Sequence, residues 1–148
     1  MRIVDNCLIT DNEQLASEIY KILSSCYLKS PWSIQQILSD IEIPENLYFL
    51  AYDDKNLLIG FMATQAIIDE MEITNIAVLP NYRRQGVAQS LFNQVSEFCG
   101  TLFLEVREGN KAAQKLYEKF GFVEFNRRKH YYTNPMEDAL LFKKEQNS

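Results

Sequence analysis

Hydrophobic residues recur at three- and four-residue intervals in two segments near the N-terminus. The first segment predicts a helix that begins near Asp11, where Thr10 and Glu13 have the spacing of a capping box. The second segment predicts a short helix after Ser33, which has the same spacing to Gln36. The apolar positions of the two helices are Leu15, Ile19, Ile22, Leu23 and Cys26, then Ile34, Ile37, Leu38 and Ile41.

The apolar pattern changes to extended runs in the middle of the chain. Residues 47–52 and 57–67 are rich in aliphatic and aromatic side chains, and they flank the polar turn at 53–56. This arrangement predicts an antiparallel hairpin. Residues 72–79 predict a third strand that Pro80 stops, because proline lacks the backbone N–H that a sheet requires.

Helical spacing returns after this strand. A third helix is predicted to end at Gly100, since glycine is a frequent helix terminator. Its apolar face consists of Val87, Leu91, Val95, Phe98 and Cys99. Residues 101–107 then alternate between two faces, which predicts a strand. The unit from 72 to 107 should therefore be a parallel strand–helix–strand crossover of right-handed sense.

The last third of the chain repeats the change from helix to strand. Asn110 can cap a fourth helix that closes at Gly121, and residues 122–126 and 139–143 are predicted strands. The order β, α, α, β, β, β, α, β, α, β, β predicts an α/β fold. We expect a single domain over residues 1–148, with a mixed central sheet flanked by helices.

Composition limits the classes of function. The 148 residues, 47% hydrophobic and 24% charged, are typical of a soluble domain. With no apolar run of about 18 residues and a charged start, we expect neither membrane span nor signal peptide, hence a cytoplasmic protein. Three separated cysteines and one histidine predict buried free thiols, no disulfide framework and no metal site. The net charge of −5 argues against autonomous nucleic-acid binding.

Residues 80–88 join the third predicted strand to the third helix and contain a candidate anion site. The first N–H groups of a helix have no intrahelical partner, and the helix dipole favours an anion there. Gly86 removes a side chain that would block a phosphate, and Arg83 and Arg84 add positive charge. The segment matches neither a Walker loop nor a dinucleotide fingerprint. Spacing alone leaves phosphate binding and a merely polar helix start as alternatives.

A family resemblance changes this balance. Arg83-x-x-Gly86-x-Ala88 resembles the Gln/Arg-x-x-Gly-x-Gly/Ala signature of the GNAT acetyltransferases. An ordered series of motifs between about Pro31 and Leu141 is similar to the RimI branch of that family, which acetylates the N-terminal alanine of a small-subunit ribosomal protein. The series comprises Pro31-Trp32, Asp69-Glu70, Asn75 to Val78, Leu104 to Arg107, Asn110, Leu116-Tyr117, Gly121-Phe122, Arg128, Tyr131-Tyr132 and Glu137 to Ala139.

The resemblance implies acetyl-CoA as the donor, and no metal. It places the donor's pyrophosphate at the helix start and its pantetheine and acetyl group along the third strand of the central group. Asn110, which a helix cap alone would explain, is also implied to contact acetyl-CoA. The implied donor residues are Ile76, Ala77, Val78, Arg83, Arg84, Gln85, Gly86, Val87, Ala88 and Asn110.

Glu105 and Tyr117 are the catalytic pair that the resemblance implies. A terminal ammonium has a pKa of about 8 and must lose a proton before it attacks, so Glu105 is expected to be the general base. The alternative is a structural ion pair with an arginine such as Arg107. Tyr117 is expected to protonate the departing thiolate, with a purely packed core aromatic as its alternative.

The acceptor side is expected around residues 127–132, the one cluster of basic and aromatic residues. A solvated loop is the default interpretation of such a run. The resemblance favours an acceptor groove formed by Trp32, Glu70, Arg128, Tyr131 and Tyr132. The expected acceptor is a protein N-terminus, which the resemblance implies to be ribosomal. A lysine side chain, a polyamine or another small amine as acceptor, and a non-catalytic acetyl-CoA-binding module, stay open as alternatives. The sequence does not determine the oligomeric state.

Overall fold

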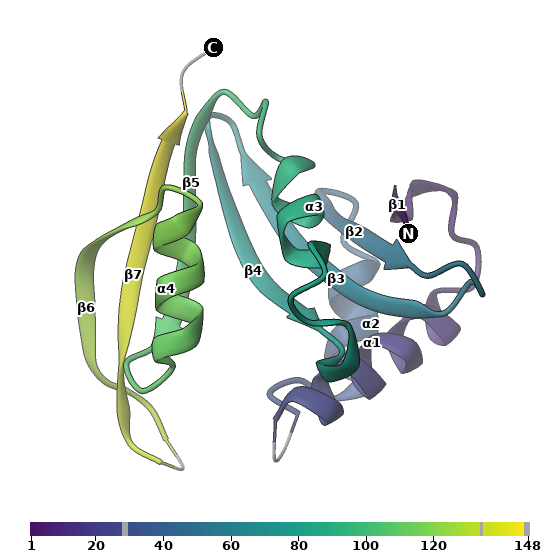
Figure 1. Ribbon diagram of the computed structural model, residues 1–148, viewed down its shortest axis with the longest axis horizontal. Helices are drawn as coiled ribbons and strands as arrows, with labels where there is room; N and C mark the ends of the chain where they lie inside the picture. The colour runs from purple at the N-terminus through teal and green to yellow at the C-terminus, as the bar shows by residue number, and fades with distance from the viewer. Residues whose placement is uncertain (28–29, 134, 147–148) are drawn as a thin grey trace.

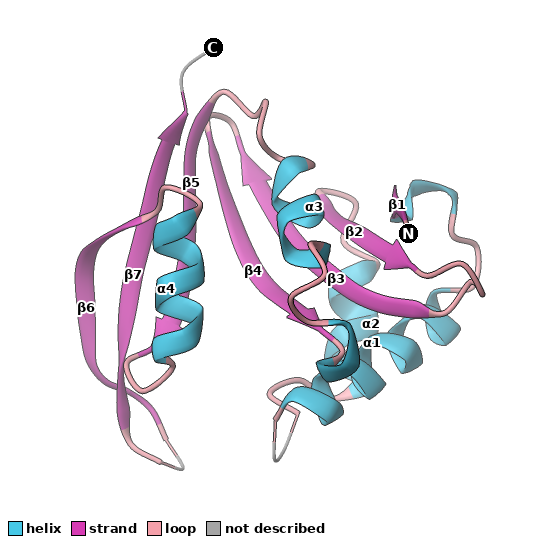
Figure 2. Ribbon diagram, in the orientation of Figure 1, coloured by secondary structure: helices cyan, strands magenta, loops and turns pink. Residues whose placement is uncertain are grey.

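A seven-stranded sheet with helices on both faces forms the framework of the computed structural model, which describes residues 1–27, 30–133 and 135–146 (Figures 1 and 2). The sheet order is β1-β2-β3-β4-β5-β7-β6, and only β4 and β5 pair in parallel. The elements are β1 (Arg2–Asp5), η1 (Asn6–Leu8), α1 (Asn12–Cys26), α2 (Ile34–Ile41), β2 (Asn46–Tyr52), β3 (Leu58–Ile67), β4 (Glu70–Val78), η2 (Pro80–Tyr82), α3 (Val87–Asn93), β5 (Gly100–Arg107), α4 (Lys111–Lys119), β6 (Val123–Tyr132) and β7 (Glu137–Gln146). The predicted α/β fold with a mixed central sheet is confirmed.

Each face of the sheet has its own hydrophobic core. One core packs α3 and α4 on β4, β5 and β7, and includes Leu91 and Phe142. The other packs α1 and α2 on β2 and β3, and includes Ile19 and Phe61. Because side chains alternate along β5, its even-numbered residues enter the first core, and Glu105 points to the opposite face.

The two parallel strands of the sheet diverge. β4 and β5 pair only from Glu70 to Glu72 on one strand and from Thr101 to Phe103 on the other. Both strands continue beyond these pairs, and their separation is visible in Figure 1. β4 keeps β3 on its other edge, and β5 keeps β7. The edges that face the opening therefore present backbone N–H and C=O groups without a strand partner.

A β-bulge precedes the open part of β4. Ala63 pairs with Asn75 while Thr64 pairs with Ile73, which leaves Thr74 as an extra residue. The extra residue reverses the alternation of side chains along the strand. Ile73 consequently packs in the α3–α4 core, whereas Ala77 packs in the α1–α2 core.

The third helix is shorter than predicted. α3 has seven residues, and the chain continues from it in turns. The side chain of Gln146 donates to the carbonyl oxygens of Val95 at 3.0 Å and Phe98 at 2.8 Å, which satisfies them outside a helix. Gly100 is not a helix terminator, because it opens β5. A Cβ at this position would overlap the carbonyl oxygen of Asp69, so glycine is required there by close approach.

Capping at the first two helices was predicted with mixed success. The N-cap of α1 is Asp11, whose carboxylate accepts the N–H of Gln14 at 3.0 Å, so the predicted capping role of Thr10 is wrong by one position. The capping box of Ser33 and Gln36 at α2 is confirmed in both of its hydrogen bonds. The error at α1 has a simple cause, because aspartate caps as well as threonine does.

The cysteines differ from the prediction of buried thiols. Cys7 and Cys99 are exposed, and Cys26 is half-buried with its Sγ 3.3 Å from the carbonyl oxygen of Val78. Within the described parts of the chain, no group of three His, Cys, Asp or Glu side chains is arranged to hold a metal ion. No helix among these residues has both the length and the apolar character needed to cross a membrane.

Candidate active site

The loop before α3 has an unusual backbone. Arg84 has a φ of 62° and Gly86 a φ of 81°, and Gly86 is the N-cap residue of α3. Glycine adopts this conformation at little cost, whereas an L-residue such as Arg84 is strained in it. A Cβ built on Gly86 meets no atom within 4 Å, so the space beside its backbone is open. The N–H groups of the first turn of α3 thus adjoin an unobstructed surface.

The side chains of this loop divide into exposed and buried groups. Arg83 and Arg84 are exposed. Gln85 folds back on the loop, and its amide donates to the carbonyl oxygen of Asn81 at 3.0 Å. Val87 is buried in the α3–α4 core, so only its backbone can face a ligand. The predicted anion site therefore consists of backbone N–H groups and the positive charges of two exposed arginine side chains, Arg83 and Arg84.

The predicted acetyl and pantetheine residues lie at the opening between the strands. Ile76, Ala77 and Val78 occupy the end of β4, beyond its last pair with β5. Their unpaired edge is the kind of backbone that can bind an extended amide-containing chain. Asn110 caps α4, since its side chain accepts the N–H of Ala113 at 3.1 Å.

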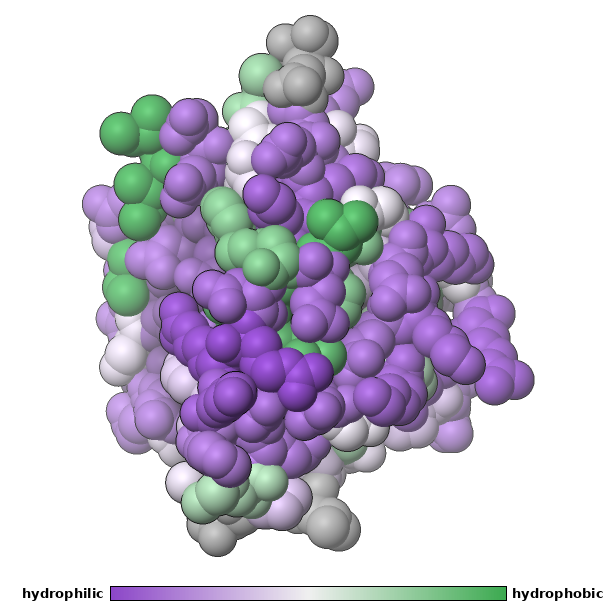
Figure 3. Space-filling view, turned by 90° about the vertical axis from the view of Figure 1, so that its left-hand side faces the viewer, coloured by the Kyte–Doolittle hydropathy of each residue, from purple (hydrophilic) through white to green (hydrophobic). Residues whose placement is uncertain are grey.

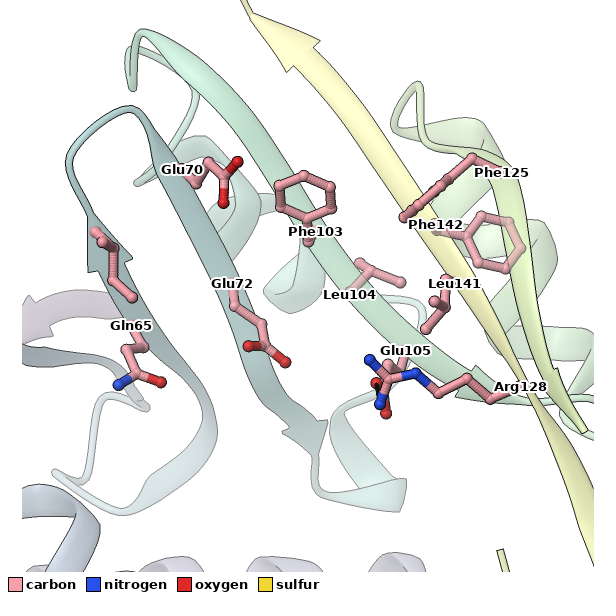
Figure 4. Close-up of a pocket in the computed structure, with 11 residues that line it drawn as sticks. Gln65, Glu70, Glu72, Phe103, Leu104, Glu105, Phe125, Arg128, Leu141 and Phe142 are labelled. Atoms are coloured by element: carbon pink, nitrogen blue, oxygen red, sulfur yellow. Dashed lines mark ion pairs between the residues drawn. The ribbon is translucent and has the colours of Figure 1, made fainter. Parts of the chain in front are cut away.

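Glu105 forms an ion pair, with a different arginine from the one expected. Its Oε1 lies 3.3 Å from Nη1 of Arg128 (Figure 4). Arg107 instead lies 3.1 Å from Glu137, and its guanidinium stacks 4.1 Å from the ring centroid of Tyr132. The Glu105 side chain remains 25% exposed and that of Arg128 52% exposed, so a ligand can reach the pair. An exposed ion pair of this kind contributes about 0–1 kcal/mol to stability, so a charged ligand can replace either partner at little cost.

Tyr117 is buried in the α3–α4 core. Its ring meets those of Phe92, Phe122 and Phe142 edge-on, and the residue is 8% exposed. Burial raises the pKa of the Tyr117 phenol, and the nearby phenols of Tyr27 and Tyr132 raise it further. The hydroxyl is therefore protonated at neutral pH. Tyr117 packs on the face of β5 opposite to the one that carries Glu105.

Tyr27, which immediately follows α1, was not predicted as a site residue. The pKa of its phenol is raised by burial and then by Cys26, and it is lowered by Arg107 and Arg83. Tyr27 also raises the pKa of the Tyr117 and Tyr132 phenols. The end of α1 therefore lies near both of these tyrosines. A tyrosine at a helix end has no distinguishing sequence signal, since packing explains it equally well.

The predicted loop at residues 127–132 is part of strand β6. β6 pairs with β7 at the edge of the sheet, and its register is irregular between Arg128 and Tyr132, where His130 has a φ of 54°. The polar composition that indicated a loop results from this edge position, where a strand is exposed to solvent. A strand holds its side chains in fixed directions, which a solvated loop does not.

Most of the predicted acceptor residues gather around Glu105. The guanidinium of Arg128 lies 5.2 Å from the ring centroid of Tyr131. The pKa of Tyr132 is raised to about 12, chiefly by burial and then by the charge of Glu105. Glu70 lines a pocket together with Glu105 and Arg128. Trp32 packs against the α1–α2 core, which also contains Ala77 of β4.

Residues 16–122 match the acetyltransferase (GNAT) family. The chain belongs to this family. A ribosomal protein bS18-alanine N-acetyltransferase from Haemophilus influenzae is 35% identical over 140 residues, which cover 91% of this chain and 90% of that protein. The crystal structure of the ribosomal-protein-S18-alanine N-acetyltransferase from Escherichia coli superposes with a TM-score of 0.82 at 30% identity, over 99% of this chain and 96% of its own.

A third relative concerns the donor. The crystal structure of a protein from Bacillus anthracis, assigned as a streptothricin acetyltransferase and in complex with acetyl coenzyme A, has a TM-score of 0.64 at 27% identity, over 74% of this chain and 67% of its own. Together with the family match, these findings confirm the resemblance to RimI enzymes and identify the protein as a GNAT N-acetyltransferase. Enzymes of this family use acetyl-CoA as the acetyl donor.

Proposed function

We propose that this GNAT enzyme acetylates the α-amino group of a protein N-terminus, the N-terminal alanine of a small-subunit ribosomal protein. The observation that carries the proposal is the identity of 35% along 91% of the chain to a bS18-alanine N-acetyltransferase. Such an acceptor places the reaction in the cytoplasm. The side chains around the opening between β4 and β5 support the same chemistry, as follows.

The donor binds along the α3 side of the opening. The pyrophosphate of acetyl-CoA lies at the N–H groups from Gln85 to Ala88, beside the open space at Gly86. Arg83 and Arg84 supply charge, and Asn110 marks the far side of the donor site. The pantetheine and acetyl group lie along the free edge of β4 at residues 76–78.

Glu105 acts as the general base on the acceptor side. The terminal ammonium displaces Arg128 from the carboxylate, and Glu105 takes its proton, directly or through a water. The neutral amine nitrogen then bonds to the thioester carbonyl carbon, whose oxygen becomes an oxyanion. Backbone N–H groups on the free edge of β4 stabilise that charge.

Tyr117 acts as the general acid from the donor side. As the intermediate collapses, the carbon–sulfur bond breaks, and the thiolate takes the phenolic proton. The cationic nitrogen gives its second proton to the phenolate that is left, which yields the amide and restores Tyr117. The raised pKa of Tyr117 keeps this proton in place until a stronger base forms beside it. Glu105 and Tyr117 thus approach the reacting carbon from the two faces of β5.

The acceptor assignment is tested with one peptide that has a free alanine terminus and an internal lysine. An α-amine has a pKa of about 7.7–8.0 and lysine about 10.4, so near neutral pH far more of the α-amine is free to attack. Mass spectrometry after incubation with acetyl-CoA should locate the acetyl group at the terminus. A copy with a blocked terminus is the control, and equally fast acetylation of that copy would replace the proposal with lysine acetylation.

A further inference from the structure

A pocket of about 270 Å³ extends from Glu105 along the sheet, on the face opposite α3 and α4. α1 and α2 pack on β2 and β3, which leaves this part of the face open. The surrounding surface on the β6 side is mainly hydrophilic, with separate apolar patches (Figure 3). Its lining includes Glu70, Glu72, Phe103, Glu105, Phe125 and Arg128.

More negative than positive side chains line the pocket. Glu70, Glu72 and Glu105 line the pocket with a single cation, Arg128, which is already paired with Glu105 (Figure 4). The pKa of Glu72 is raised by burial and then by the charge of Glu105, and Arg128 lowers it only in part. The loss of water around Glu72 and its repulsion by Glu105 are therefore only partly compensated, and a bound cation would relieve both.

The opposite wall of the pocket is apolar. Phe103 and Phe125 meet edge-on, with ring centroids 5.8 Å apart, and Leu141 lies beside them. Lys143 Nζ already lies 5.4 Å from the Phe125 ring centroid, so this aromatic surface accepts an ammonium group. Lysine and arginine have long apolar stems with a charged end, which suits one apolar wall and one acidic wall.

The spacing connects the pocket to the reaction centre. Glu72 lies directly across from Phe103, and Glu105 is two residues further along β5. Two strand residues span about 7 Å. An extended acceptor with its amine at Glu105 advances by about 3.4 Å per residue, so the side chain of its second or third residue reaches Glu72.

We infer that this pocket binds a lysine or arginine side chain at the second or third position of the acceptor. The inference rests on the proposed function, because it assumes a peptide whose terminus lies at Glu105. It makes Glu72 a specificity-determining residue and gives the enzyme a preference for N-termini followed by a basic residue. Glu105, the base, and Glu72, the specificity-determining residue, then line the same cavity.

The experiment uses peptides that begin Ala-Lys-Lys or Ala-Gln-Gln and are otherwise identical. The intact enzyme should have a lower KM for the lysine peptide, and Glu72→Gln should reduce that preference about tenfold, the effect of one hydrogen-bonded charge. Glu97→Gln, an exposed change of equal charge in the turns after α3, should leave the preference intact. Added salt should weaken the preference.

Three results would overturn the inference: no preference in the intact enzyme, an equal loss of preference in both variants, or an unchanged preference in Glu72→Gln. If both peptides are acetylated equally, the pocket assignment fails while the proposed function stands. If neither is acetylated at the terminus, the proposed function fails. Direct binding of the two fluorescent peptides then decides the pocket, since equal dissociation constants would reject it without any need for turnover.

Discussion

The carboxylate of Glu137 accepts a hydrogen bond from the backbone N–H of Gly109 at 2.8 Å. Its other oxygen lies 3.1 Å from Arg107 Nη1. A Cβ at Gly109 would lie 2.7 Å from Glu137 Oε2, so the contact requires glycine or a displaced carboxylate. Because Gly109 lies between the strand of Glu105 and the helix of Tyr117, this contact holds the loop that sets their relative positions.

Gly109→Ala should lower the free energy of unfolding by about 0.5–1.5 kcal/mol, because the flexible end of the Glu137 side chain must move away from the Gly109 N–H. Denaturant titration measures the change. In a Glu137→Ala background the same substitution should cost less, since the clash partner is gone. An equal cost in both backgrounds would show that the two residues are not coupled.

Gly86→Ala should weaken acetyl-CoA binding more than it weakens the fold. The new methyl group would project into the open space beside the helix start, where we place the pyrophosphate. The positive φ adds about 1–2 kcal/mol of backbone strain. Thermal melts of the intact enzyme should show stabilisation of about 2.7 kcal/mol at a hundredfold excess of acetyl-CoA over its dissociation constant.

NAD and ATP are the controls for this measurement, and neither should shift the melting temperature. The acetyl-CoA shift should shrink clearly in Gly86→Ala, after correction for the lower stability of the free variant. If acetyl-CoA shifts the melting temperature of Gly86→Ala as much as that of the intact enzyme, the loop is not part of the donor site.

Glu105→Gln should retain acetyl-CoA binding but slow acetyl transfer by about 10²–10⁴, because the amide keeps the shape but cannot accept the proton. Raising the pH should recover part of the rate, since more of the acceptor amine is then neutral. Steady-state and single-turnover rates measure both effects. Unchanged single-turnover rates at neutral pH would reduce Glu105 to a structural partner of Arg128.

Glu72→Gln should make the fold slightly more stable at pH 7. A raised pKa means that the folded state penalises the ionised carboxylate, so the contribution of Glu72 to stability is present below its unfolded pKa and is lost as the pH rises through the folded pKa. The permanently neutral glutamine avoids this loss. The gain should vanish in denaturation measured below about pH 3, where glutamate is protonated in both states. A gain that is the same at both pH values would contradict the electrostatic cause.

The errors in the predicted elements have a common origin in contacts between distant residues. The apolar spacing from Val87 to Cys99 is helical, but Gln146 binds the carbonyls of Val95 and Phe98 and a close approach to Asp69 determines Gly100. By contrast, the hairpin over 47–67 depends on a local turn and was predicted well. Contacts that arise only after folding are absent from local periodicity.

The site shows the same division. The glycine of the donor loop was recognisable because its role depends on its own φ and on the helix that follows. The pairing of Glu105 with Arg128 and the proximity of Tyr27 to Tyr117 depend on strand order and helix docking. Glu72 appeared to be an ordinary strand residue, and only the neighbouring strand made it a pocket residue.

The sequence by itself determined the order of the elements, the glycine at the donor loop and the family, because these follow from periodicity, backbone conformation and an ordered series of motifs. Tertiary structure decided what surrounds the reaction centre. The bulge at Thr74 and the divergence of β4 from β5 opened a free edge, and the alternation of β5 placed Glu105 and Tyr117 on opposite faces. Register and strand separation arise from the whole sheet at once, so no local segment of the chain encodes them alone.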